Sequence, residues 1–273
     1  MIKHQSGYHN PQFLKKDGKG HPYQGYVTDV VTEQGIQWLK NTESSRPFLL
    51  MLHHPAPHMP FHEKEYLQEA FKNNHYKEPV SFWDPEKNRQ GMPRPFNITM
   101  EGLMTFQGRE KAYGKKAWKV PEDLKEKERK QWIYQRYMRA YMACIRSLDQ
   151  NIGKLMKYLK DSGLDENTIV IYTSDQGFFL GEHGWYDKRF FYEESIRMPL
   201  IIKHPNVSGG RRCDKMVLNI DLAETILDMA GITIPDEMQG ASLLPLLKHP
   251  HKTKQWRKAM YYEYFEDRPD SPL

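Results

Sequence analysis

Apolar residues in this chain gather in short continuous runs that are separated by longer amphipathic stretches. The runs at 47–53 and 168–173 are rich in Leu, Ile and Val, a pattern typical of strands that are covered on both faces. Two further runs, at 199–203 and 258–264, also predict strands. Between 74 and 120 the sequence is dense in Pro, Gly, Asn and charge and has no sustained period, so no regular element is predicted there.

Amphipathic stretches predict helices at 28–40, 63–71 and 121–161. In the longest of them, apolar residues recur every three or four positions and mark one buried stripe. This stripe comprises Tyr137, Tyr141, Ile145, Leu148, Ile152, Leu155 and Leu159. Asp221 and Glu224 have the spacing of a capping box for a further helix. Because buried strands alternate with helices, the sequence predicts an α/β fold with a mostly parallel sheet sandwiched by helices.

Composition narrows the functional classes. The net charge is +5, but basic residues are interleaved with acidic ones, so we expect no nucleic-acid partner. No apolar run approaches the length that crosses a membrane, and nothing after Met1 resembles a signal peptide. Two cysteines are too few for a disulfide framework. We expect Cys144 to be a core thiol on a helix and Cys213 to be a free loop residue.

The end of the run at 168–173 is followed by Ser174, Asp175, Gln176 and Gly177. Open α/β sheets bind their ligands at the carboxyl ends of strands. Asp175 and Gln176 offer two adjacent hard oxygens that suit Ca²⁺ or Mg²⁺. The alternative is a simple strand-to-loop turn in which the Asp side chain binds nearby backbone.

A lone lysine, Lys188, lies thirteen residues beyond Asp175. It is either a surface charge or, near the same sheet edge, a point charge that holds an anion. Glu182 and His183 stand between the two, where they could orient a metal loop or cap turns. The stretch from Tyr192 to Arg197 reads as helical, with packing and internal salt bridges as its expected role.

The loop after the run at 47–53 contains His53, His54, His58 and His62 among three prolines. Proline stiffens the backbone, and a rigid loop can fix an imidazole against a ligand. Zinc is a weaker alternative, because no Cys or carboxylate completes a regular ligand spacing. We expect at most one or two of these histidines to be functional and the others to be structural or exposed.

Three segments together resemble the sulfatase family in order and spacing. They are PFLLMLHHPAPHMPF, SLDQNIGKLMKYLKDSGLDENTIVIYTSDQG and LGEHGWYDKRFFYEESIRMPLIIKHP. The chain is most similar to bacterial sulfatases of the N-acetylglucosamine-6-sulfatase kind, from about Gly25 to Leu247. The resemblance implies an alkaline-phosphatase-type α/β fold and a Ca²⁺-dependent sulfuric ester hydrolase that acts on sulfated sugar, glycosaminoglycan or mucin-type glycan. It also implies a periplasmic or extracellular location.

The resemblance assigns a role to four residues. Asp175 and Gln176 would be two ligands of Ca²⁺, in preference to Mg²⁺, with Gln176 where the family often has Asn or His. His58 would contact the sulfate ester and protonate the leaving oxygen, and Lys188 would bind the sulfate and share that role. A cation and two such side chains neutralise charge that builds on a sulfuryl group.

The family nucleophile, a formylglycine made from Cys or Ser in C-x-P-S-x-R, has no counterpart in this sequence. We therefore expect a partial chain, incomplete at both ends and inactive alone. Residues 1–247 would be the middle to C-terminal part of the α/β domain, and 248–273 the start of a C-terminal region. Two alternatives remain open, a phosphoric or phosphonic ester hydrolase of the same superfamily and a non-catalytic protein that binds sulfated glycan.

Overall fold

A computed structural model describes most of the chain. The residues described are 7–15, 17–43, 46–84, 98–107, 118–249, 253 and 255–263. They form two compact units, and each is described by itself. The first unit comprises residues 1–164 and 179–187, and the second comprises residues 165–178 and 188–271. No helix in the described part of the chain is long and apolar enough to span a membrane.

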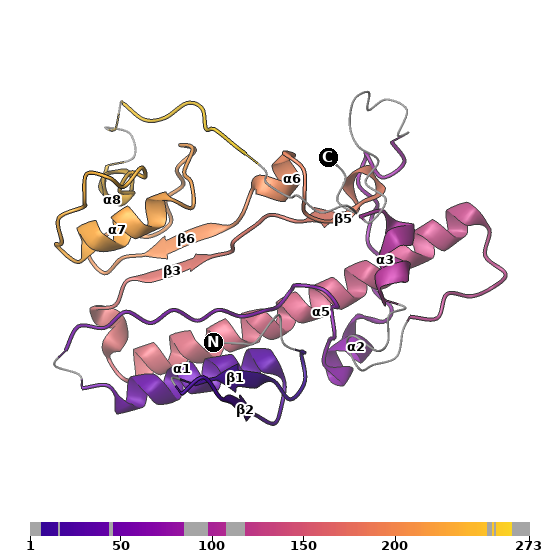
Figure 1. The fold of residues 1–273 in the computed structure, drawn as a ribbon, viewed down its shortest axis with the longest axis horizontal. Helices are drawn as coiled ribbons and strands as arrows, with labels where there is room; N and C mark the ends of the chain where they lie inside the picture. The colour runs from indigo at the N-terminus through magenta and orange to yellow at the C-terminus, as the bar shows by residue number, and fades with distance from the viewer. Residues whose placement is uncertain are drawn as a thin grey trace. The chain divides into compact units, whose positions relative to one another are not determined.

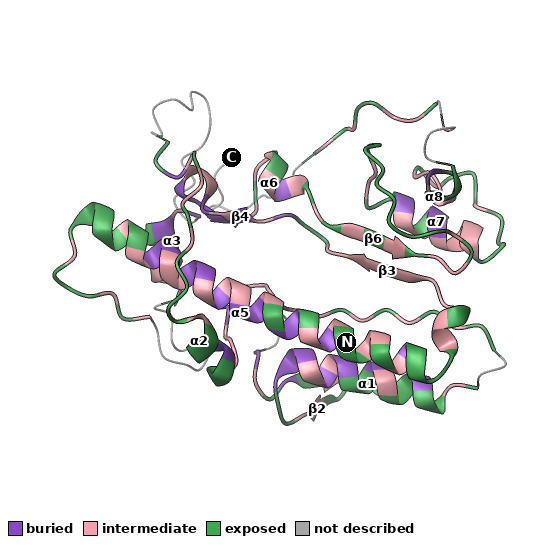
Figure 2. Ribbon diagram, turned by 180° about the vertical axis from the view of Figure 1, so that it is seen from behind, coloured by how far each residue is buried: buried purple, intermediate pink, exposed green. Residues whose placement is uncertain are grey.

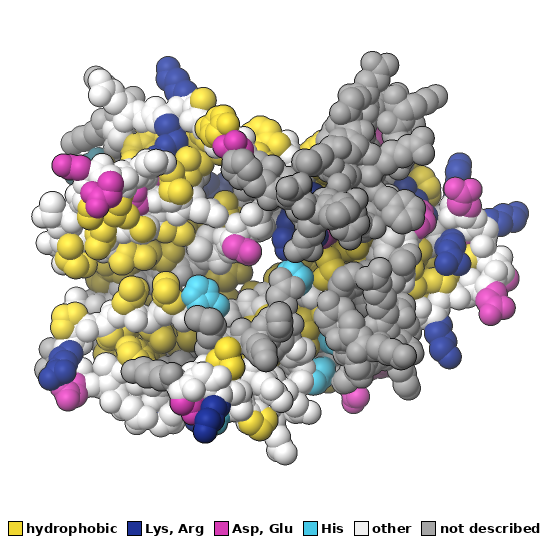
Figure 3. Space-filling view, viewed as in Figure 1, with side chains coloured by type: hydrophobic (Ala, Val, Ile, Leu, Met, Phe, Trp, Pro, Cys, Tyr) yellow, Lys and Arg dark blue, Asp and Glu magenta, His cyan; other side chains and the backbone are white. Residues whose placement is uncertain are grey.

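The first unit is built around one long helix, α5 (Glu126–Asp161). Helices α1 (Val27–Asn41), α2 (Glu65–Phe71) and α3 (Met100–Gln107) pack against it, and α1 runs alongside its carboxyl-terminal half (Figure 1). One face of α5 is buried and the opposite face is exposed (Figure 2). Around its first turns, acidic and basic side chains alternate on the surface, at the right of Figure 3.

Two short antiparallel pairs complete the first unit. Strands β1 (Gln12–Leu14) and β2 (Gly20–Pro22) pair near the amino terminus. Strands β4 (Phe179–Leu180) and β5 (Tyr186–Asp187) pair across the tight turn η3 (Glu182–Gly184). The first residue of β4, Phe179, is fully buried, and its carbonyl accepts a hydrogen bond from the Tyr137 hydroxyl of α5 at 2.8 Å. This segment is therefore part of the core around α5, although the residues on either side of it belong to the second unit.

The described part of the second unit contains an antiparallel pair and three helices. Strand β3 (Val170–Thr173) pairs with β6 (Leu200–Lys203), with Val170 opposite Lys203 and Thr173 opposite Leu200. The short turn η2 (Leu164–Glu166) precedes β3. Helices α6 (Glu193–Ile196), α7 (Asp221–Met229) and α8 (Leu244–Lys248) follow.

The buried carboxylate of Asp221 links three segments of the second unit. It accepts hydrogen bonds from the backbone N–H groups of Leu218 and Ala241, both at 2.8 Å, and forms an ion pair with Arg257. Burial alone would raise the pKa of Asp221, but the hydrogen bonds from Arg257 and these amides lower it. The predicted capping box is wrong, because Asp221 is the first residue of α7 and Glu224 accepts instead from the Gly240 N–H at 2.5 Å.

The predicted helices are confirmed by α1, α2, α5 and α7, and the strands at 168–173 and 199–203 by β3 and β6. The longest helix begins at Glu126, five residues after its predicted start at Pro121. Helix α3 was not predicted, because its eight residues lie in a stretch without a sustained period. The run of alternating charge at 109–130, which is expected to be a solvated surface, lies partly outside the described residues.

The strand predicted at 47–53 is wrong for the described residues, in which this segment is extended but has no ladder partner. Its residues alternate in burial: Leu52 lies against Gly35 of α1, whereas Leu49 and Met51 are 62% and 63% exposed. All ladders among the described residues are antiparallel, so the expected parallel pairing is not seen in them. Residues 258–263 form no strand either, and Tyr264 lies outside the description.

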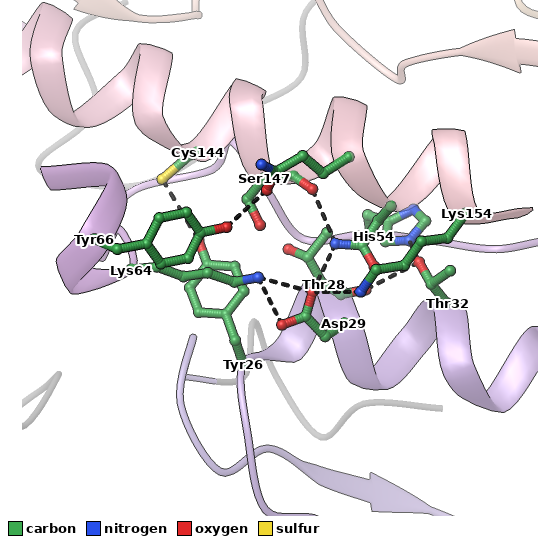
Figure 4. A network of polar contacts seen from close by, with 12 residues as sticks. Tyr26, Thr28, Asp29, Thr32, His54, Lys64, Tyr66, Cys144, Ser147 and Lys154 are labelled. Carbon is green, nitrogen blue, oxygen red and sulfur yellow. Dashed lines mark hydrogen bonds and ion pairs between the residues drawn. The ribbon is translucent and has the colours of Figure 1, made fainter. Parts of the chain in front are cut away.

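A polar network stabilises the interface between α1 and α5 (Figure 4). The carboxylate of Asp29 pairs with Lys64 at 2.6 Å and accepts a hydrogen bond from Asn151 at 2.7 Å. Burial raises the pKa of Asp29, but the hydrogen bonds from Lys64 and Asn151 outweigh it and lower the pKa below its usual value. The carboxylate therefore stays ionised inside the unit.

His54 is a structural member of the same region. Thr32 Oγ1 donates to the Thr28 carbonyl at 3.0 Å, so the 2.9 Å contact between Thr32 Oγ1 and His54 Nε2 must have the imidazole as donor. Burial, with a smaller contribution from His53, lowers the pKa of His54 to about 4. The ring is therefore neutral near pH 7, as expected for a structural histidine of this loop.

Gly177 permits a close approach of two backbones in the second unit. A Cβ at this position would lie 2.2 Å from the Glu194 carbonyl oxygen and 2.7 Å from that of Arg197. The Gly177 N–H donates to the Ser195 carbonyl at 2.9 Å. The loop after β3 therefore packs directly on the backbone of α6 at Gly177, where there is no room for a side chain.

His54 makes stability depend on pH. Because its folded pKa of about 4 is below the ordinary value of 6.5, the stability that it contributes is fully present above pH 6.5 and is lost as the pH falls through 4. Between pH 7 and pH 4, we expect the free energy of unfolding to fall by roughly 3 kcal/mol less in His54→Gln than in the parent protein. Urea unfolding at a series of pH values measures this, with exposed His75→Gln as the control. An unchanged pH slope in His54→Gln would contradict the assignment.

Gly177→Ala is expected to lower the free energy of unfolding by roughly 1–3 kcal/mol, because the added methyl group meets backbone oxygens that cannot move independently. Gly209→Ala is the matched control, since no atom lies within 4 Å of its Cβ position. We expect that variant to stay within about 0.5 kcal/mol of the parent protein. Equal stability of the two variants in urea unfolding would show that the close approach is not tight.

Candidate active-site residues

Asp175 and Gln176 lie directly after β3, as the sequence predicts. Their backbone is fixed by hydrogen bonds on both residues. The Asn219 side chain donates to the Asp175 carbonyl at 3.2 Å, and the Ser174 hydroxyl donates to the Gln176 carbonyl at 2.9 Å. With the bond from the Gly177 N–H to the Ser195 carbonyl, the two consecutive peptide groups after Asp175 and Gln176 are held in place.

Asp175 and Gln176 are both exposed. Neither forms a side-chain hydrogen bond or ion pair with another described residue. The turn alternative, in which the Asp175 carboxylate binds nearby backbone, is therefore not what these contacts show. The carboxylate and amide oxygens remain open to a ligand.

The chemistry of this pair fits a hard cation. Ca²⁺ binds carboxylate and amide oxygens and takes about six to eight oxygen ligands, so two side chains would supply part of its coordination shell. Within the described part of the chain, no group of three or more His, Cys, Asp or Glu side chains could hold a metal ion. Asp175 and Gln176 would thus need further oxygen ligands to hold Ca²⁺.

Lys188 lies in the second unit with this pair. Its Nζ lies 5.8 Å from the centre of the Phe178 ring, which belongs to the same loop as Asp175 and Gln176. The next residue is held too, because the Arg189 N–H donates to the Ser195 hydroxyl at 3.2 Å. The lysine is half-buried and directed over the loop that follows β3.

His58 belongs to the first unit and lies in the proline loop. Its N–H donates to the Pro55 carbonyl at 2.8 Å, and its own carbonyl accepts a hydrogen bond from the Tyr8 hydroxyl at 2.5 Å. The ring Nδ1 lies 2.8 Å from the Met59 carbonyl oxygen. A carbonyl oxygen can only accept, so Nδ1 holds the proton in the neutral ring and Nε2 is the nitrogen that takes up a further proton.

Glu182 and His183 shape a turn. The Glu182 carboxylate accepts from the Leu180 N–H at 2.6 Å, and His183 Nδ1 pairs with Asp84 at 3.0 Å. These contacts agree with the turn-capping alternative for both residues. The salt bridge predicted for the helical stretch after Lys188 is confirmed by the Arg197–Glu193 pair at 3.2 Å in α6 and its C-cap.

Neither cysteine has the surroundings of a nucleophile. Cys144 is fully buried on α5, as predicted, and burial raises the pKa of its thiol to about 12. Cys213 is exposed, also as predicted, and is followed by Asp-Lys-Met-Val.

Sequence reasoning missed the residues that hold the candidate side chains in place. Asn219 and Ser195 support the loop after β3, and Tyr8 supports His58. Each acts on a backbone group far away in sequence, so no local motif marks it.

Two family models match the chain. The model for type I phosphodiesterase / nucleotide pyrophosphatase matches residues 2–221, and the model for the C-terminal part of N-sulphoglucosamine sulphohydrolase matches residues 181–271. Together they cover nearly the whole sequence, including all four candidate residues.

Individual relatives of the chain are named as sulfatases. An N-acetylglucosamine-6-O-sulfatase of Bacteroides thetaiotaomicron is 38% identical, over 97% of this chain and 54% of that protein. The N-acetylglucosamine-6-sulfatase of Bos taurus is 30% identical, over 88% of this chain and 38% of its own length. The chain thus spans about half the length, or less, of these curated relatives.

A solved structure extends the likeness to three dimensions. It shows a protein in complex with its substrate D-glucosamine-2-N,6-O-disulfate, and it matches this chain with a TM-score of 0.88 and 36% identity. The match covers 97% of this chain and 61% of that protein. The predicted alkaline-phosphatase-type α/β fold is confirmed by this neighbour and by the family models. The chain belongs to the sulfatase family of the alkaline-phosphatase superfamily.

Proposed function

We propose that the protein to which this chain belongs is a sulfuric ester hydrolase that removes sulfate from a sulfated glucosamine residue of a glycan. The observation that carries the proposal is the likeness, over 97% of this chain, to a structure whose bound substrate is D-glucosamine-2-N,6-O-disulfate. The names of the sequence relatives support the same substrate class. The phosphoric or phosphonic ester alternative is supported by the name of one family model, but the relatives of 30% identity or more named above are sulfatases and the bound substrate of the matching structure is a sulfated sugar. We further propose that the protein works in the periplasm or outside the cell.

Asp175 and Gln176 are proposed to hold Ca²⁺ through their exposed oxygens. When bound, the cation would supply positive charge against the negative charge that builds on the sulfuryl oxygens. The fixed backbone supports this role, since ligands that are already in place lose little freedom on binding. Lys188 is proposed to bind the sulfate as a point charge.

His58 is proposed to be the proton donor to the leaving sugar oxygen, a role that Lys188 could share. Because Nδ1 donates to the Met59 carbonyl, the exchangeable proton would lie on Nε2. The nucleophile is proposed to be a formylglycine outside the printed residues. The buried thiol of Cys144 and the sequence around Cys213 exclude both as its source under the family motif.

The first test is sulfate release from glucosamine 6-sulfate by the full-length gene product, measured by ion chromatography. We expect His58→Gln to lower kcat by about 10²–10⁴-fold, as loss of a general acid does. Lys188→Ala should lower kcat/KM because it removes charge from the sulfate site. Exposed His75→Gln and Lys215→Ala are the matched controls and should keep full activity.

The 273-residue chain alone is expected to release no sulfate, because it lacks C-x-P-S-x-R. Turnover by this chain that is lost in His58→Gln would contradict the proposed outside nucleophile. Preferential hydrolysis of the corresponding phosphate ester by the full-length protein would favour the phosphoric ester alternative.

The second test concerns the cation. We expect Asp175→Asn, which removes the negative charge of one ligand, to raise the Ca²⁺ concentration for half-maximal activity by about tenfold or more. Changes to residues that only support a metal ligand already lower metal affinity by about tenfold or more. Titration of chelator-treated full-length protein with Ca²⁺ measures it, with exposed Asp214→Asn as the control. An unchanged Ca²⁺ requirement in Asp175→Asn would place the cation elsewhere.

A further inference from the structure

Tyr8 is a buried residue near the amino terminus whose hydroxyl meets the backbone of a proposed catalytic residue. It is 2% exposed, and its hydroxyl donates to the His58 carbonyl at 2.5 Å, although the two residues are fifty positions apart. The ring lies 5.6 Å from that of Tyr26 and 6.2 Å from that of His62, measured between centroids. Tyr8 thus fills the space between the start of α1 and the proline loop.

The position of Tyr8 is itself fixed by the start of α1. The Val27 N–H donates to the Tyr8 carbonyl at 2.7 Å, and the Asn10 N–H donates to the Gly25 carbonyl at 2.8 Å. Asn10 Oδ1 accepts in return from the Gly25 N–H at 3.0 Å. These bonds tie the segment around Tyr8 to α1, which packs on α5.

The hydroxyl of Tyr8 acts on the peptide group that controls the His58 ring. That peptide joins the His58 carbonyl to Met59, and the Met59 carbonyl accepts the ring Nδ1–H. Movement of the peptide would therefore change the Nδ1 contact and the direction of Nε2. Burial raises the pKa of Tyr8 well above its ordinary value, so the hydroxyl remains a donor at all pH values of interest.

We propose that Tyr8 is a positioning residue that keeps the His58 imidazole in its Nδ1–H form, with Nε2 as the proton-transferring nitrogen. This inference rests on the proposed role of His58 in sulfate ester hydrolysis. The Tyr8 hydroxyl donates to the backbone carbonyl of His58, whereas the ring Nδ1 contacts the Met59 carbonyl. Tyr8 acts on the His58 ring through the backbone of the proline loop. No sequence motif of that loop indicates this role.

The test compares two tyrosines that each lose one buried hydroxyl. Both hydroxyls interact with the Cys144 thiol, which lies 3.8 Å from the Tyr26 hydroxyl, but only the Tyr8 hydroxyl also donates to the His58 carbonyl. Tyr8→Phe therefore removes the donor to His58, whereas Tyr26→Phe leaves it in place. The first readout is the ¹⁵N chemical shifts of the His58 ring in the 273-residue chain, assigned with His58→Gln. We expect the Nδ1–H form in the parent chain and in Tyr26→Phe, and averaged Nδ1 and Nε2 shifts in Tyr8→Phe.

The second readout is the activity of the full-length protein with glucosamine 6-sulfate. Tyr8→Phe should lower kcat/KM about tenfold, the usual effect of one lost hydrogen bond, mainly through kcat. An Nε2–H ring in the parent chain, or unchanged ring shifts in folded Tyr8→Phe, would overturn the proposal. If the ring shifts change as expected but the parent protein releases no sulfate, the positioning role stands and the proposed function fails.

Discussion

The structure depends on one constraint at its candidate site: Asp175 and Gln176, in the loop after β3, are held through their backbone carbonyls and not through their own side chains. The carbonyls of Asp175 and Gln176 and the N–H of Gly177 are all hydrogen-bonded within the second unit. Because these bonds use backbone groups, the carboxylate and amide oxygens stay exposed. A loop fixed by its own polar side chains would have consumed the groups that a cation needs. Gly177 makes the arrangement possible, since any side chain there would meet the carbonyl oxygens of Glu194 and Arg197.

In the first unit, the proline loop around His58 is likewise held by hydrogen bonds to its backbone. The backbone of His58 is bound at its N–H by Pro55 and at its carbonyl by Tyr8. Beyond it, Phe61 is fully buried and packs on Tyr137 of α5, with ring centroids 5.2 Å apart. At the end of this loop, Glu63 forms an ion pair of 2.7 Å with Arg136 of α5. The long helix thus serves as the rigid support against which the histidine loop is set.

The sequence predicted the elements with a strong period and the residues in a recognisable spacing. Helices α1 and α5 and strands β3 and β6 follow from their apolar patterns, and Asp175 and Gln176 lie at the predicted strand end. The strand predicted at 47–53 is not found, because an apolar run indicates burial but does not specify a partner strand. The supports from Tyr8, Asn219 and Ser195 could not be predicted, since each joins groups that only the folded chain brings together. His54 shows the same limit, because its contact with Thr32 and the Nδ1 contact of His58 with Met59 form only in the folded chain.

The central claim is that the exposed oxygens after β3 hold the cation of a sulfatase. A crystal structure of the full-length protein with Ca²⁺ and a sulfated glucosamine tests it most directly. The account predicts that Asp175 and Gln176 oxygens lie about 2.3–2.6 Å from the Ca²⁺ ion. It also predicts that Lys188 Nζ lies within hydrogen-bond distance of the sulfate. A Ca²⁺ ion bound elsewhere, with the Asp175 carboxylate still in solvent beside the bound sugar, would contradict it.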